Sequence, residues 1–287
     1  MRIDRFTDGD VEVEVLPELG ARLHRVRAFG HEVLRTPPDP ATHAADPFFW
    51  GGYVMTPWCN RVEPDAIEVG GRQLQLGANF RDGTAIHGQV YVAPWTDEGD
   101  GSYSIRAGGD GWPWPYEAGA HYAVSGGTVA IELRVTNLAD APMPAGIGIH
   151  PWFLRPLEVA IHADAVFPSN LATEPDPDPV TGAFDLRRLA PMADDLDGCW
   201  ARIGDPAVTI RWPETGLTMI MRAGATVPVI VAASPHDVDA VAIEPQTHAP
   251  QALRRTNGEE PLGLEWLAPG ASLVLDAALA FERATGA

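Results

Sequence analysis

Cysteine is scarce in this chain, because Cys59 and Cys199 are the only two among 287 residues. Two thiols can form at most one disulfide, whose existence the sequence leaves open, and they cannot build a structural zinc site unaided. The proline- and aspartate-rich residues 174–179 lack the ligand spacing of a calcium loop, so proline turns explain them better. The sequence therefore predicts no metal site, and nothing in it points to a cofactor.

Positive charge is also scarce, because 20 Lys and Arg residues stand against 39 Asp and Glu residues and the formal net charge is −19. Such a surface repels phosphate groups, which argues against nucleic acid and anionic membranes as partners. No run approaches the roughly 18 apolar residues of a membrane-spanning helix, and Met1–Phe6 lacks the apolar core of a signal peptide. We expect a cytoplasmic protein, with an oligomeric state that the sequence leaves open.

Long helical patterns, internal repeats of about 20–50 residues and a nucleotide-binding fingerprint are missing as well. The chain has instead short segments in which apolar and polar residues alternate, such as Val11–Val15 and Val129–Val135. Its 29 glycines and 27 prolines suit many short strands joined by turns, and Gly70-Gly71 marks a two-residue hairpin. The sequence predicts one all-β domain over residues 1–287, a sandwich of packed, twisted sheets.

Two segments do not fit a strand pattern and are predicted to be loops. Residues 36–47 are rich in Pro, Asp and Ala, and their His43 is expected to be solvated. Residues 112–116, with the sequence Trp-Pro-Trp-Pro-Tyr, contain too many prolines for a central strand, because proline removes a hydrogen-bond donor from the sheet. This aromatic loop could pack on the core or form a wall of a sugar site.

The most distinctive segment, residues 146–153, is predicted to be a strand that ends in a histidine. Side chains alternate across a strand, so His150 shares its face with Gly146 and Gly148, which leave that face bare. Glycine inside a strand often marks the close approach of a ligand or another backbone, and Pro151 favours an extended backbone at the histidine. For this segment alone, a structural histidine beside a tight packing contact is the simpler interpretation.

A second predicted strand, residues 240–246, repeats this design with a carboxylate. Its two alanines share a face with Glu244, and a proline again follows. In residues 85–88, His87 likewise follows a small residue on its own face and precedes a glycine. We expect His150, His87 and Glu244 to converge on one concavity. Its floor would be the small residues of the two strands, Gly146, Gly148, Ala240 and Ala242.

Five short motifs, in their order along the chain, resemble those of the aldose 1-epimerases, also called galactose mutarotases. They are Asn60-Arg61, Ile86-His87-Gly88, His150-Pro151-Trp152-Phe153, Leu196-Asp197 and Glu244-Pro245-Gln246. The segment Val180–Arg187 also resembles the loop before the family's aspartate. The resemblance implies a single-domain β-supersandwich and the cofactor-free interconversion of the α and β anomers of a sugar.

The resemblance also implies a role for each matched residue. Glu244 corresponds to the family's general base, His150 to its general acid, and His87 to its second active-site histidine. Arg61 and Asp197 correspond to the residues that bind the substrate. For each of these two a structural alternative stays open, an ion pair for the arginine and a turn for the aspartate.

Further sugar-binding residues are predicted from their chemistry. Asn60 stands next to the matched arginine, and Trp50, Trp112 or Trp152 could stack on a sugar face. The chain departs from the family where Trp152 replaces a frequent tyrosine and where Gln89 replaces a second glycine. These departures affect the expected substrate preference more than the expected chemistry.

Two rival functions stay open. The first is a hexose-6-phosphate 1-epimerase, which needs arginines that converge on the phosphate. The candidates for that cluster are Arg72, Arg81, Arg155, Arg187 and Arg188. The second is a non-catalytic carbohydrate-binding protein of the same fold, which would keep the aromatic residues without needing an acid/base pair. The presence of both Glu244 and His150 favours an enzyme.

Overall fold

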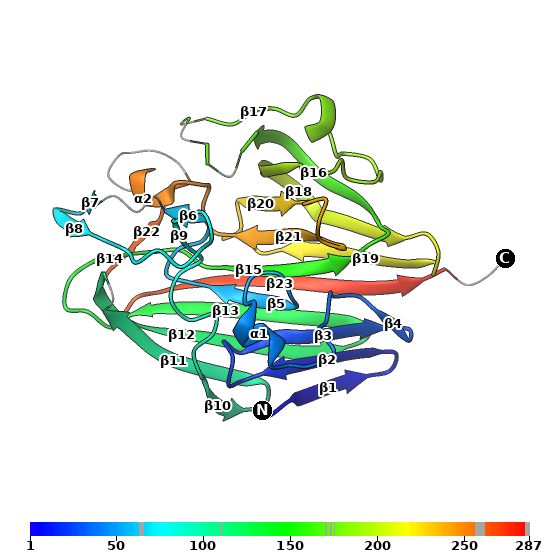
Figure 1. Cartoon of the computed structure of the whole chain (residues 1–287), viewed down its shortest axis with the longest axis horizontal. Helices are drawn as coiled ribbons and strands as arrows, with labels where there is room; N and C mark the ends of the chain where they lie inside the picture. Colours follow the sequence, from blue (N-terminus) through cyan, green and yellow to red (C-terminus); the bar gives the residue numbers. More distant parts are fainter. Residues whose placement is uncertain are drawn as a thin grey trace.

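The structure of this chain is a computed structural model that describes residues 1–62, 66–109, 111–169, 171–172, 174, 176–255 and 262–284. Its main feature is one curled sheet of 17 strands (Figure 1), whose neighbouring strands pair antiparallel. The sheet folds back on itself into two packed layers, so the fold is an all-β supersandwich, as the sequence predicts.

The first layer carries the candidate functional residues. Its strands pair in the order β1, β2, β3, β5, β15, β21 and β20, and β4 extends the end of β3. Their bounds are β1 Asp4–Asp8, β2 Val11–Leu16, β3 Arg22–Ala28, β4 His31–Glu32, β5 Gly52–Met55, β15 Gly148–Leu154, β21 Ala240–Gln246 and β20 Val229–Ala233.

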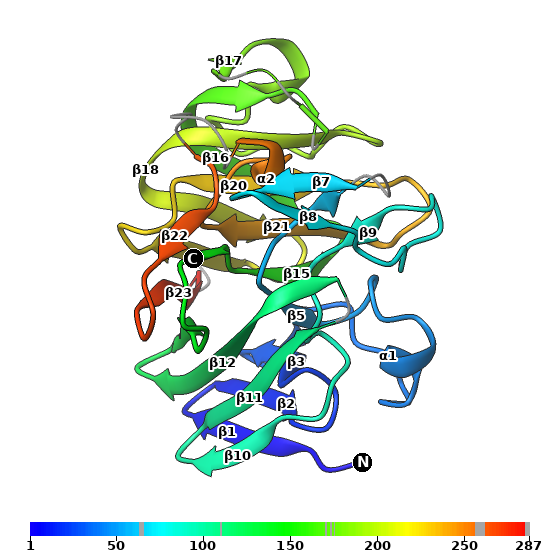
Figure 2. The same ribbon diagram turned by 90° about the vertical axis from the view of Figure 1, so that its left-hand side faces the viewer.

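The second layer packs against the first. Its strands pair in the order β10, β11, β12, β13, β23 and β19. Their bounds are β10 Thr96–Gly99, β11 Ser102–Gly109, β12 Trp112–Ser125, β13 Thr128–Asn137, β23 Ser272–Arg283 and β19 Leu217–Ala223. In the side view of Figure 2, β11 and β12 cross in front of β1, β2 and β3, and β12 contacts β1 and β2 directly.

One long strand, β18 (Asp197–Trp212), belongs to both layers. Its first part pairs with β20 of the first layer, and its last part pairs with β19 of the second. β16 (Glu158–Phe167) follows β18 along both parts, with an irregular register between them, and β17 (Asp178–Pro179) pairs with its end. A bend of this kind lets a single sheet close over its own core.

Short elements complete the described chain. Three two-stranded ribbons and three helical turns lie outside the main sheet. The ribbons are β6 (Arg61–Val62) with β9 (Ala85–Ile86), β7 (Ile67–Val69) with β8 (Arg72–Leu74), and β14 (Met143–Ala145) with β22 (Glu265–Leu267). The helical turns are α1 (Thr42–Ala45), α2 (Ala252–Arg255) and a 3₁₀ turn at Gly182–Phe184.

The hydrophobic core fills the space between the two layers. Val11, Val13 and Val15 of β2 are each 1% exposed or less, and β13 alternates buried and more exposed side chains along its length. This is the period of two that a strand with one covered face requires. The alternation predicted for both segments and the hairpin at Gly70-Gly71 are confirmed. Cys59 and Cys199 are both buried and free.

The prediction of a loop at residues 112–116 is wrong, because these residues begin β12. Trp112 pairs with β11, whereas pairing with β13 starts only at Tyr116. The two prolines therefore lie where β12 has a neighbour on one side only, a position that proline tolerates. They are exposed, while Trp112, Trp114 and Tyr116 point into the core.

The prediction of a solvated His43 is also wrong, because its side chain is 0% exposed within α1. Its Nδ1 lies 2.9 Å from Nη1 of Arg22, and its Nε2 lies 2.9 Å from Nδ1 of His24. Since a guanidinium can only donate, Nδ1 of His43 accepts and its Nε2–H donates to His24. Arg22 and His24 of β3, about 20 residues away in sequence, thus supply hydrogen bonds to a histidine that local composition predicts to be exposed.

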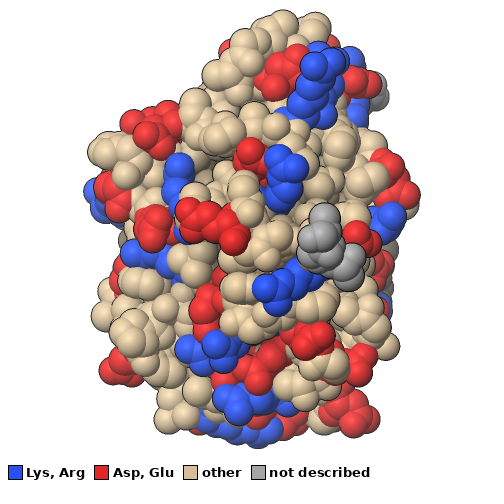
Figure 3. Space-filling view, turned by 90° about the vertical axis from the view of Figure 1, so that its right-hand side faces the viewer, with Lys and Arg blue, Asp and Glu red and all other residues tan. Residues whose placement is uncertain are grey.

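The surface carries the acidic excess in a dispersed form. Figure 3 shows one face on which acidic and basic side chains are interspersed. Many arginines pair with carboxylates, as in the contacts Arg27–Glu32, Arg106–Glu117 and Arg134–Glu132. In the described ranges, no helix is long and apolar enough to cross a membrane. Of the proline-rich segment 168–182, residues 170, 173 and 175 lie outside the described part of the chain.

Candidate active site

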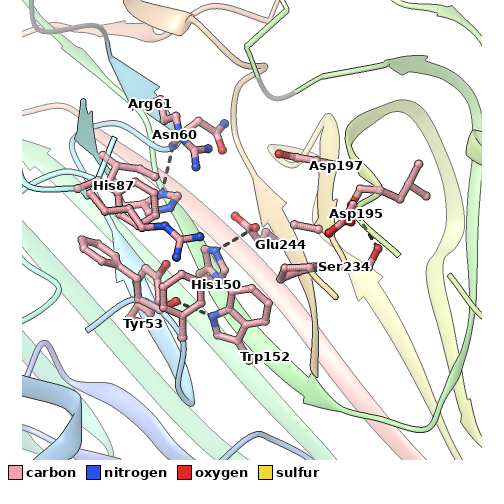
Figure 4. Close-up of a pocket in the computed structure, with 18 residues that line it drawn as sticks. Tyr53, Asn60, Arg61, His87, His150, Trp152, Asp195, Asp197, Ser234 and Glu244 are labelled. Carbon is pink, nitrogen blue, oxygen red and sulfur yellow. Dashed lines mark hydrogen bonds and ion pairs between the residues drawn. The ribbon is translucent and has the colours of Figure 1, made fainter. Parts of the chain in front are cut away.

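The candidate active site is a pocket of about 170 Å³ over the first layer of the sheet (Figure 4). Strand β15 runs between β5 and β21 and pairs with both. The register of β15 with β5 places His150 opposite Tyr53. In the register of β15 with β21, Gly148 pairs with Gln246 and Trp152 with Ala242, so His150, halfway between, lies opposite Glu244. Side chains directly opposite in antiparallel strands share a face. Tyr53, His150 and Glu244 therefore form a row on the pocket wall.

His150 and Glu244 are in contact and buried. Nε2 of His150 lies 3.1 Å from Oε1 of Glu244, and the residues are 6% and 2% exposed. Burial raises the pKa of Glu244 well above its usual value, and the charge of Asp197 raises it further. Burial lowers the pKa of His150 to about 3, and the charge of Arg61 lowers it as well. Loss of solvent disfavours both charged forms, so the pair tends to hold a single proton.

An amide pair orients the carboxylate. Gln246 follows Glu244 by two positions, so both lie on the same face of β21. Its Nε2 donates to Oε2 of Glu244 at 2.8 Å, and its Oε1 accepts from Nδ2 of Asn60 at 2.7 Å. This arrangement fixes Oε2 and leaves Oε1 directed at His150. The side chain of Asn60, predicted to bind the sugar, lines the pocket and holds Gln246 in place.

His87 reaches the pocket from the tight turn after β9. Both His87 and Asn60 have φ of +61°, a conformation that ordinary residues rarely adopt. The two residues hold each other, because the backbone N–H of Asn60 donates to Nδ1 of His87 at 3.2 Å. The neutral ring must therefore carry its proton on Nε2. Burial lowers the pKa of His87 well below its usual value, and the neighbouring His150 adds to this shift, so the ring is a neutral donor.

Aromatic rings pack around both histidines. The ring of Tyr53 stacks on His150, with centroids 4.7 Å apart and planes inclined by 21°, and His87 meets His150 edge-on at 5.1 Å. Trp152 lines the pocket, but its indole N–H donates to the carbonyl of Phe48 at 2.6 Å. Trp152 can thus offer a sugar its ring face and not a hydrogen bond. These contacts restrict the orientation of the His150 ring.

Charged residues occupy the outer part of the pocket. Arg61 lines the pocket from β6. Its Nε lies 2.8 Å from Oδ2 of Asp82, and its guanidinium lies over the ring of Phe80. Asp197 lines it from the first position of β18. Arg61 therefore both forms the ion pair of the structural alternative and lines the pocket. The two residues lie on different sides of Glu244 in Figure 4.

A sequence profile of the Aldose 1-epimerase family matches residues 5–278. The chain belongs to this family. It is 25% identical over 255 residues to the uncharacterized protein YphB of Escherichia coli K12. The match covers 80% of this chain and 83% of YphB. Two solved structures are similar over most of their length. The galactose mutarotase-like protein of Clostridium acetobutylicum has a TM-score of 0.84 at 18% identity and covers 97% of this chain and 94% of its own. The galactose 1-epimerase of Lactobacillus acidophilus has a TM-score of 0.78 at 18% identity, with 97% and 93% covered.

The aldose 1-epimerase motifs of this chain meet in one place. His150, His87, Glu244, Arg61 and Asp197, which lie far apart in the sequence, all line the same pocket, together with Asn60 and Trp152. Pairing of β15 with β21 brings His150 and Glu244 together. Pairing of β6 with β9 places the turns of Asn60 and His87 side by side. The convergence expected for the three predicted catalytic residues is therefore present.

The expected floor of small residues is wrong. The two glycines of the strand before His150 and the two alanines before Glu244 do not line the pocket. A Cβ atom at Gly146 would lie 2.2 Å from Cδ2 of His248, and one at Gly148 would lie 2.8 Å from Cε of Met55. The glycines make room for side chains that pack beside the strand, the packing explanation that glycine in a strand also allows.

His248 supports the pocket from outside it. Its Nδ1–H donates to the carbonyl of Ala249 at 2.8 Å, and its Nε2 accepts from the backbone N–H of Cys59 at 3.0 Å. Burial lowers its pKa to about 4. With both ring nitrogens used and no place in the pocket lining, His248 positions the turn that carries Asn60.

Two of the three tryptophans proposed to stack on a sugar lie elsewhere. Trp112 is 0% exposed in β12 and packs on Trp58 and Trp114. Trp50 does not line the pocket; its indole N–H donates to Asp46. Trp152 remains, because β15 carries it two positions after His150 on the same face.

Several pocket residues were not predicted from the sequence. They are Phe48, Phe49, Tyr53, Phe80, Asp195, Ala233, Ser234 and Pro235. Ile86, Leu196 and Gln246 stand in the matched motifs and Arg81 among the phosphate candidates, but the sequence gives none of these four a role toward a free sugar. Tyr53 could not be predicted, because only the register of β5 with β15 reveals it. Asp195, with φ of +58°, pairs with His236 at 2.8 Å on the pocket rim. In the described residues, no cluster of His, Cys, Asp and Glu could hold a metal ion.

Proposed function

We propose that this protein interconverts the α and β anomers of a free aldohexose. The observation that carries the proposal is the contact of 3.1 Å between Nε2 of His150 and Oε1 of Glu244 in a buried pocket of about 170 Å³. A pocket smaller than those of drug-sized ligands suits one sugar ring. Membership of the aldose 1-epimerase family supports the same activity.

Anomer exchange requires one base and one acid on neighbouring atoms. The C1 hydroxyl loses its proton while the ring oxygen O5 gains one, so that the C1–O5 bond breaks and its electron pair goes to O5 as C1=O forms. Glu244 takes the proton from the C1 hydroxyl and His150 donates to O5. Both oxygens are bonded to C1, so acid and base must be adjacent, as opposite residues of β15 and β21 are. Each group contributes about 10²–10⁴-fold to the rate.

The second half of the reaction reverses these roles. Rotation about C1–C2 turns the other face of the aldehyde towards the C5 hydroxyl. His150 then takes the proton from this hydroxyl, and Glu244 returns its proton to the carbonyl oxygen. The ring closes as the opposite anomer, and the pair ends with the proton on His150, as it began. No net proton is gained or lost, so no exchange with solvent is needed during turnover.

The single proton of the pair has a defined path. Without substrate, burial places it on Glu244, because burial raises the pKa of that carboxyl and lowers the pKa of His150. A sugar that hydrogen-bonds both groups stabilises the form with the carboxylate ionised and the imidazole protonated. Gln246 supports the same form, because its Nε2 already donates to Oε2 of the carboxylate. His87 offers its Nε2–H as a neutral donor to O5.

The charges around the pocket favour a neutral sugar over a sugar phosphate. Of the five arginines considered for a phosphate site, Arg81 is the one that lines the pocket within the described part of the chain. Arg61 is already paired with Asp82, while Asp195 and Asp197 add negative charge to the lining. The formal charges of Arg61 and Arg81 are cancelled by those of the two aspartates, so a phosphate dianion would gain no net attraction there. Arg61 and Asp197 instead offer a donor and an acceptor to sugar hydroxyls.

The proposal is tested by optical rotation. Freshly dissolved α-D-glucose or α-D-galactose should reach its equilibrium rotation faster with the protein than in buffer alone, in proportion to protein concentration. The Glu244→Gln variant at equal concentration is the matched control for general effects of protein. If no free or 6-phosphorylated aldose is accelerated while calorimetry shows sugar binding, the protein is a carbohydrate-binding protein and the epimerase proposal is wrong.

A further inference from the structure

A row of four side chains crosses the first layer of the sheet, and its first member, Arg22, has no part in the proposed reaction. In the antiparallel pairing of β3 with β5, the residue after Arg22 meets the residue before Tyr53, so the two lie opposite each other. The registers of β15 with β5 and with β21 continue the row through His150 to Glu244. In Figure 4, His150 lies between Tyr53 and Glu244. The row thus runs from a guanidinium through an aromatic ring and an imidazole to a carboxylate.

The ring of Tyr53 is held between its two neighbours in the row. Strand β5 lies between β3 and β15, so Arg22 and His150 approach the ring from opposite sides. Cζ of Arg22 is 5.3 Å from the ring centroid, within the range of a cation–π contact, and the ring of His150 is stacked 4.7 Å away. The hydroxyl of Tyr53 has no hydrogen-bond partner among the described residues. Contacts of the ring, and not a hydrogen bond, therefore set the position of this side chain.

His150 depends on the Tyr53 ring for its orientation. An active-site histidine is usually oriented by a hydrogen bond at the ring nitrogen that does not react. Nδ1 of His150 is buried and has no such partner in the described part of the chain, while Nε2 is the nitrogen that contacts Glu244. Of the ring contacts of His150 in the same residues, the one with Tyr53 is the closest and the most nearly parallel. The stack therefore takes the place of the missing hydrogen bond.

Arg22 is a buried cation that no carboxylate contacts. It is 0% exposed, and it forms no ion pair with the described residues. Its guanidinium donates to the carbonyl groups of Leu19, Pro47 and Tyr91 and to Nδ1 of His43, all of them uncharged partners. Burial lowers the pKa of Arg22 to about 10, which leaves it charged at neutral pH. A charge that is buried and not directly paired acts on its neighbours more strongly than one in water.

The charge of Arg22 reaches His150. Burial lowers the pKa of His150, and the charges of Arg61 and Arg22 lower it as well. Asp46 opposes this effect, because it also acts on Arg22, but its carboxylate binds the indole of Trp50 and not the guanidinium. The other titratable groups that share the pocket with His150 include two cations and two aspartates whose formal charges cancel. These groups are Tyr53, His87, Glu244, Arg61, Arg81, Asp195 and Asp197.

We infer that Arg22 is a positioning residue for the proposed reaction and acts through Tyr53. Its guanidinium holds the ring that orients His150, and its charge sets the pH range in which His150 and Glu244 share a single proton. A cation disfavours each proton that the pair takes up, so both limits of this range lie at lower pH with Arg22 than without it. The inference rests on the proposed anomer exchange, because the shared proton is the one that this exchange moves.

The pH profile of mutarotation tests the role of the charge. Polarimetry gives kcat/KM for α-D-glucose between about pH 5 and pH 9, after subtraction of the rate in the same buffer without protein. Arg22→Met should move the optimum upward by about 0.5–1 pH unit, and Arg22→Lys, which restores the charge, should move it back. Arg27→Met is the matched control, because it removes the same charge from an exposed position of β3 outside the pocket. It should leave the optimum unchanged.

The kcat of Tyr53 variants tests the role of the ring. Tyr53→Leu should lower kcat about tenfold, because the imidazole loses its fixed plane, and Tyr53→Phe, which restores the ring, should recover most of this loss. This pair decides the inference if circular dichroism shows that Arg22→Met does not fold.

The role of Arg22 is disproved if Tyr53→Leu keeps the kcat of the unmodified protein, or if Arg22→Met moves the optimum no further than Arg27→Met does. Either result, obtained while the unmodified protein accelerates mutarotation, leaves the proposed anomer exchange in place. If the unmodified protein accelerates no sugar at any pH, both proposals are wrong.

Discussion

The protein contains two buried histidine pairs of nearly the same geometry. His87 and His150 meet edge-on with centroids 5.1 Å apart and planes at 85°, and His24 and His43 meet at 5.2 Å and 76°. Tyr53 stands close to both pairs, because it stacks on His150 at 4.7 Å and lies 5.3 Å below Cζ of Arg22, which binds His43. Geometry within a pair therefore does not distinguish a histidine that lines the pocket from one buried in the core.

The partners of the two pairs differ. In the structural pair, Arg22 donates to His43, His43 donates to His24, and Nε2 of His24 lies 4.0 Å from Oε2 of Glu14. Glu14 is itself neutralised by Arg5 and Arg25. These polar atoms are thus directed at other protein groups, and the residues are sealed from solvent.

The other pair keeps polar atoms for a ligand. Nδ1 of His87 is used by the Asn60 backbone, while its Nε2–H has no partner among the described residues. Nε2 of His150 contacts Glu244, and both residues line a pocket that a small molecule can enter. Incomplete satisfaction of buried polar atoms is costly in a core and useful in a site. The comparison teaches that access and unused hydrogen bonds distinguish the pair that lines the pocket from the pair in the core.

Replacing the carboxylate beside the pair that lines the pocket should have the largest effect. Glu244→Gln keeps the shape and removes the base, so the kcat for mutarotation should fall about 10³–10⁴-fold. Polarimetry gives the rate, and circular dichroism checks that the fold is retained. A variant with a normal rate would show that another group removes the C1 proton.

Loss of the acid should have the next largest effect. His150→Asn removes the proton donor while Tyr53 and Glu244 remain, so kcat should fall about 10²–10³-fold. The same replacement in the other pair, His24→Asn, should change kcat by less than about twofold, because no atom of His24 reaches the pocket. Similar losses in both variants would mean that the two pairs act as one catalytic network.

Stability should respond in the opposite order. His24→Asn breaks the hydrogen bond to His43 and leaves a buried acceptor or donor unpaired, so the free energy of unfolding should fall by about 1–3 kcal/mol. His150→Asn should cost less, because Nδ1 of His150 has no hydrogen-bond partner in the described residues. Urea unfolding of the two variants measures the difference, and equal losses would contradict the assignment of the pairs.

The pH dependence of stability should show the smallest effect per group. Burial lowers the pKa of His43 to about 2 and that of His150 to about 3, whereas the unfolded value is about 6.5. As pH falls below about 6.5 the unfolded chain binds protons that the folded chain does not, so stability falls. Each histidine lowers the free energy of unfolding by up to about 1.4 kcal/mol per pH unit. Glu244 acts in the opposite direction above pH about 4.5, because its raised pKa lets the folded chain bind a proton that the unfolded chain does not, and this offsets the contribution of one histidine.

This pH prediction is measured by urea unfolding between pH 7 and pH 5. The matched variant is His43→Asn, which removes one titrating group from the structural pair and should flatten the curve. A slope unchanged by this replacement would show that His43 titrates normally in the folded protein.

Much of the fold follows from local pattern. Alternation along residues such as Val11–Val15 and Val129–Val135 predicts strands with one covered face, and these strands are present. Residues 112–116 defeat the local rule, because proline is excluded from a strand only where both neighbours pair, and β12 has one neighbour there. His43 defeats it too, because its burial depends on an arginine of another strand.

The candidate site divides in the same way. His150, Glu244 and His87 could be singled out from their motifs, and the structure brings them into one pocket. Tyr53 could not, because the register of β5 with β15 places it there. Of the five candidate arginines, only the folded chain decides that Arg81 lines the pocket. Gly146 and Gly148 do mark a close approach, but the groups that approach them are His248 and Met55 and not a ligand. A missing side chain predicts a close contact without revealing which group makes it.

By itself the sequence determined most of the strands, because alternation with a period of two marks them. Its motifs also singled out His150, His87 and Glu244 as candidate acid/base residues. Only the tertiary structure decided that β15 lies between β5 and β21. That order sets His150 between a tyrosine ring and a carboxylate. The contacts of α1 with β3 bury His24 and His43, whereas His87 and His150 line the pocket. Solvent access and strand neighbours are properties of the folded chain, and they place one of two similar histidine pairs in a pocket and the other in the core.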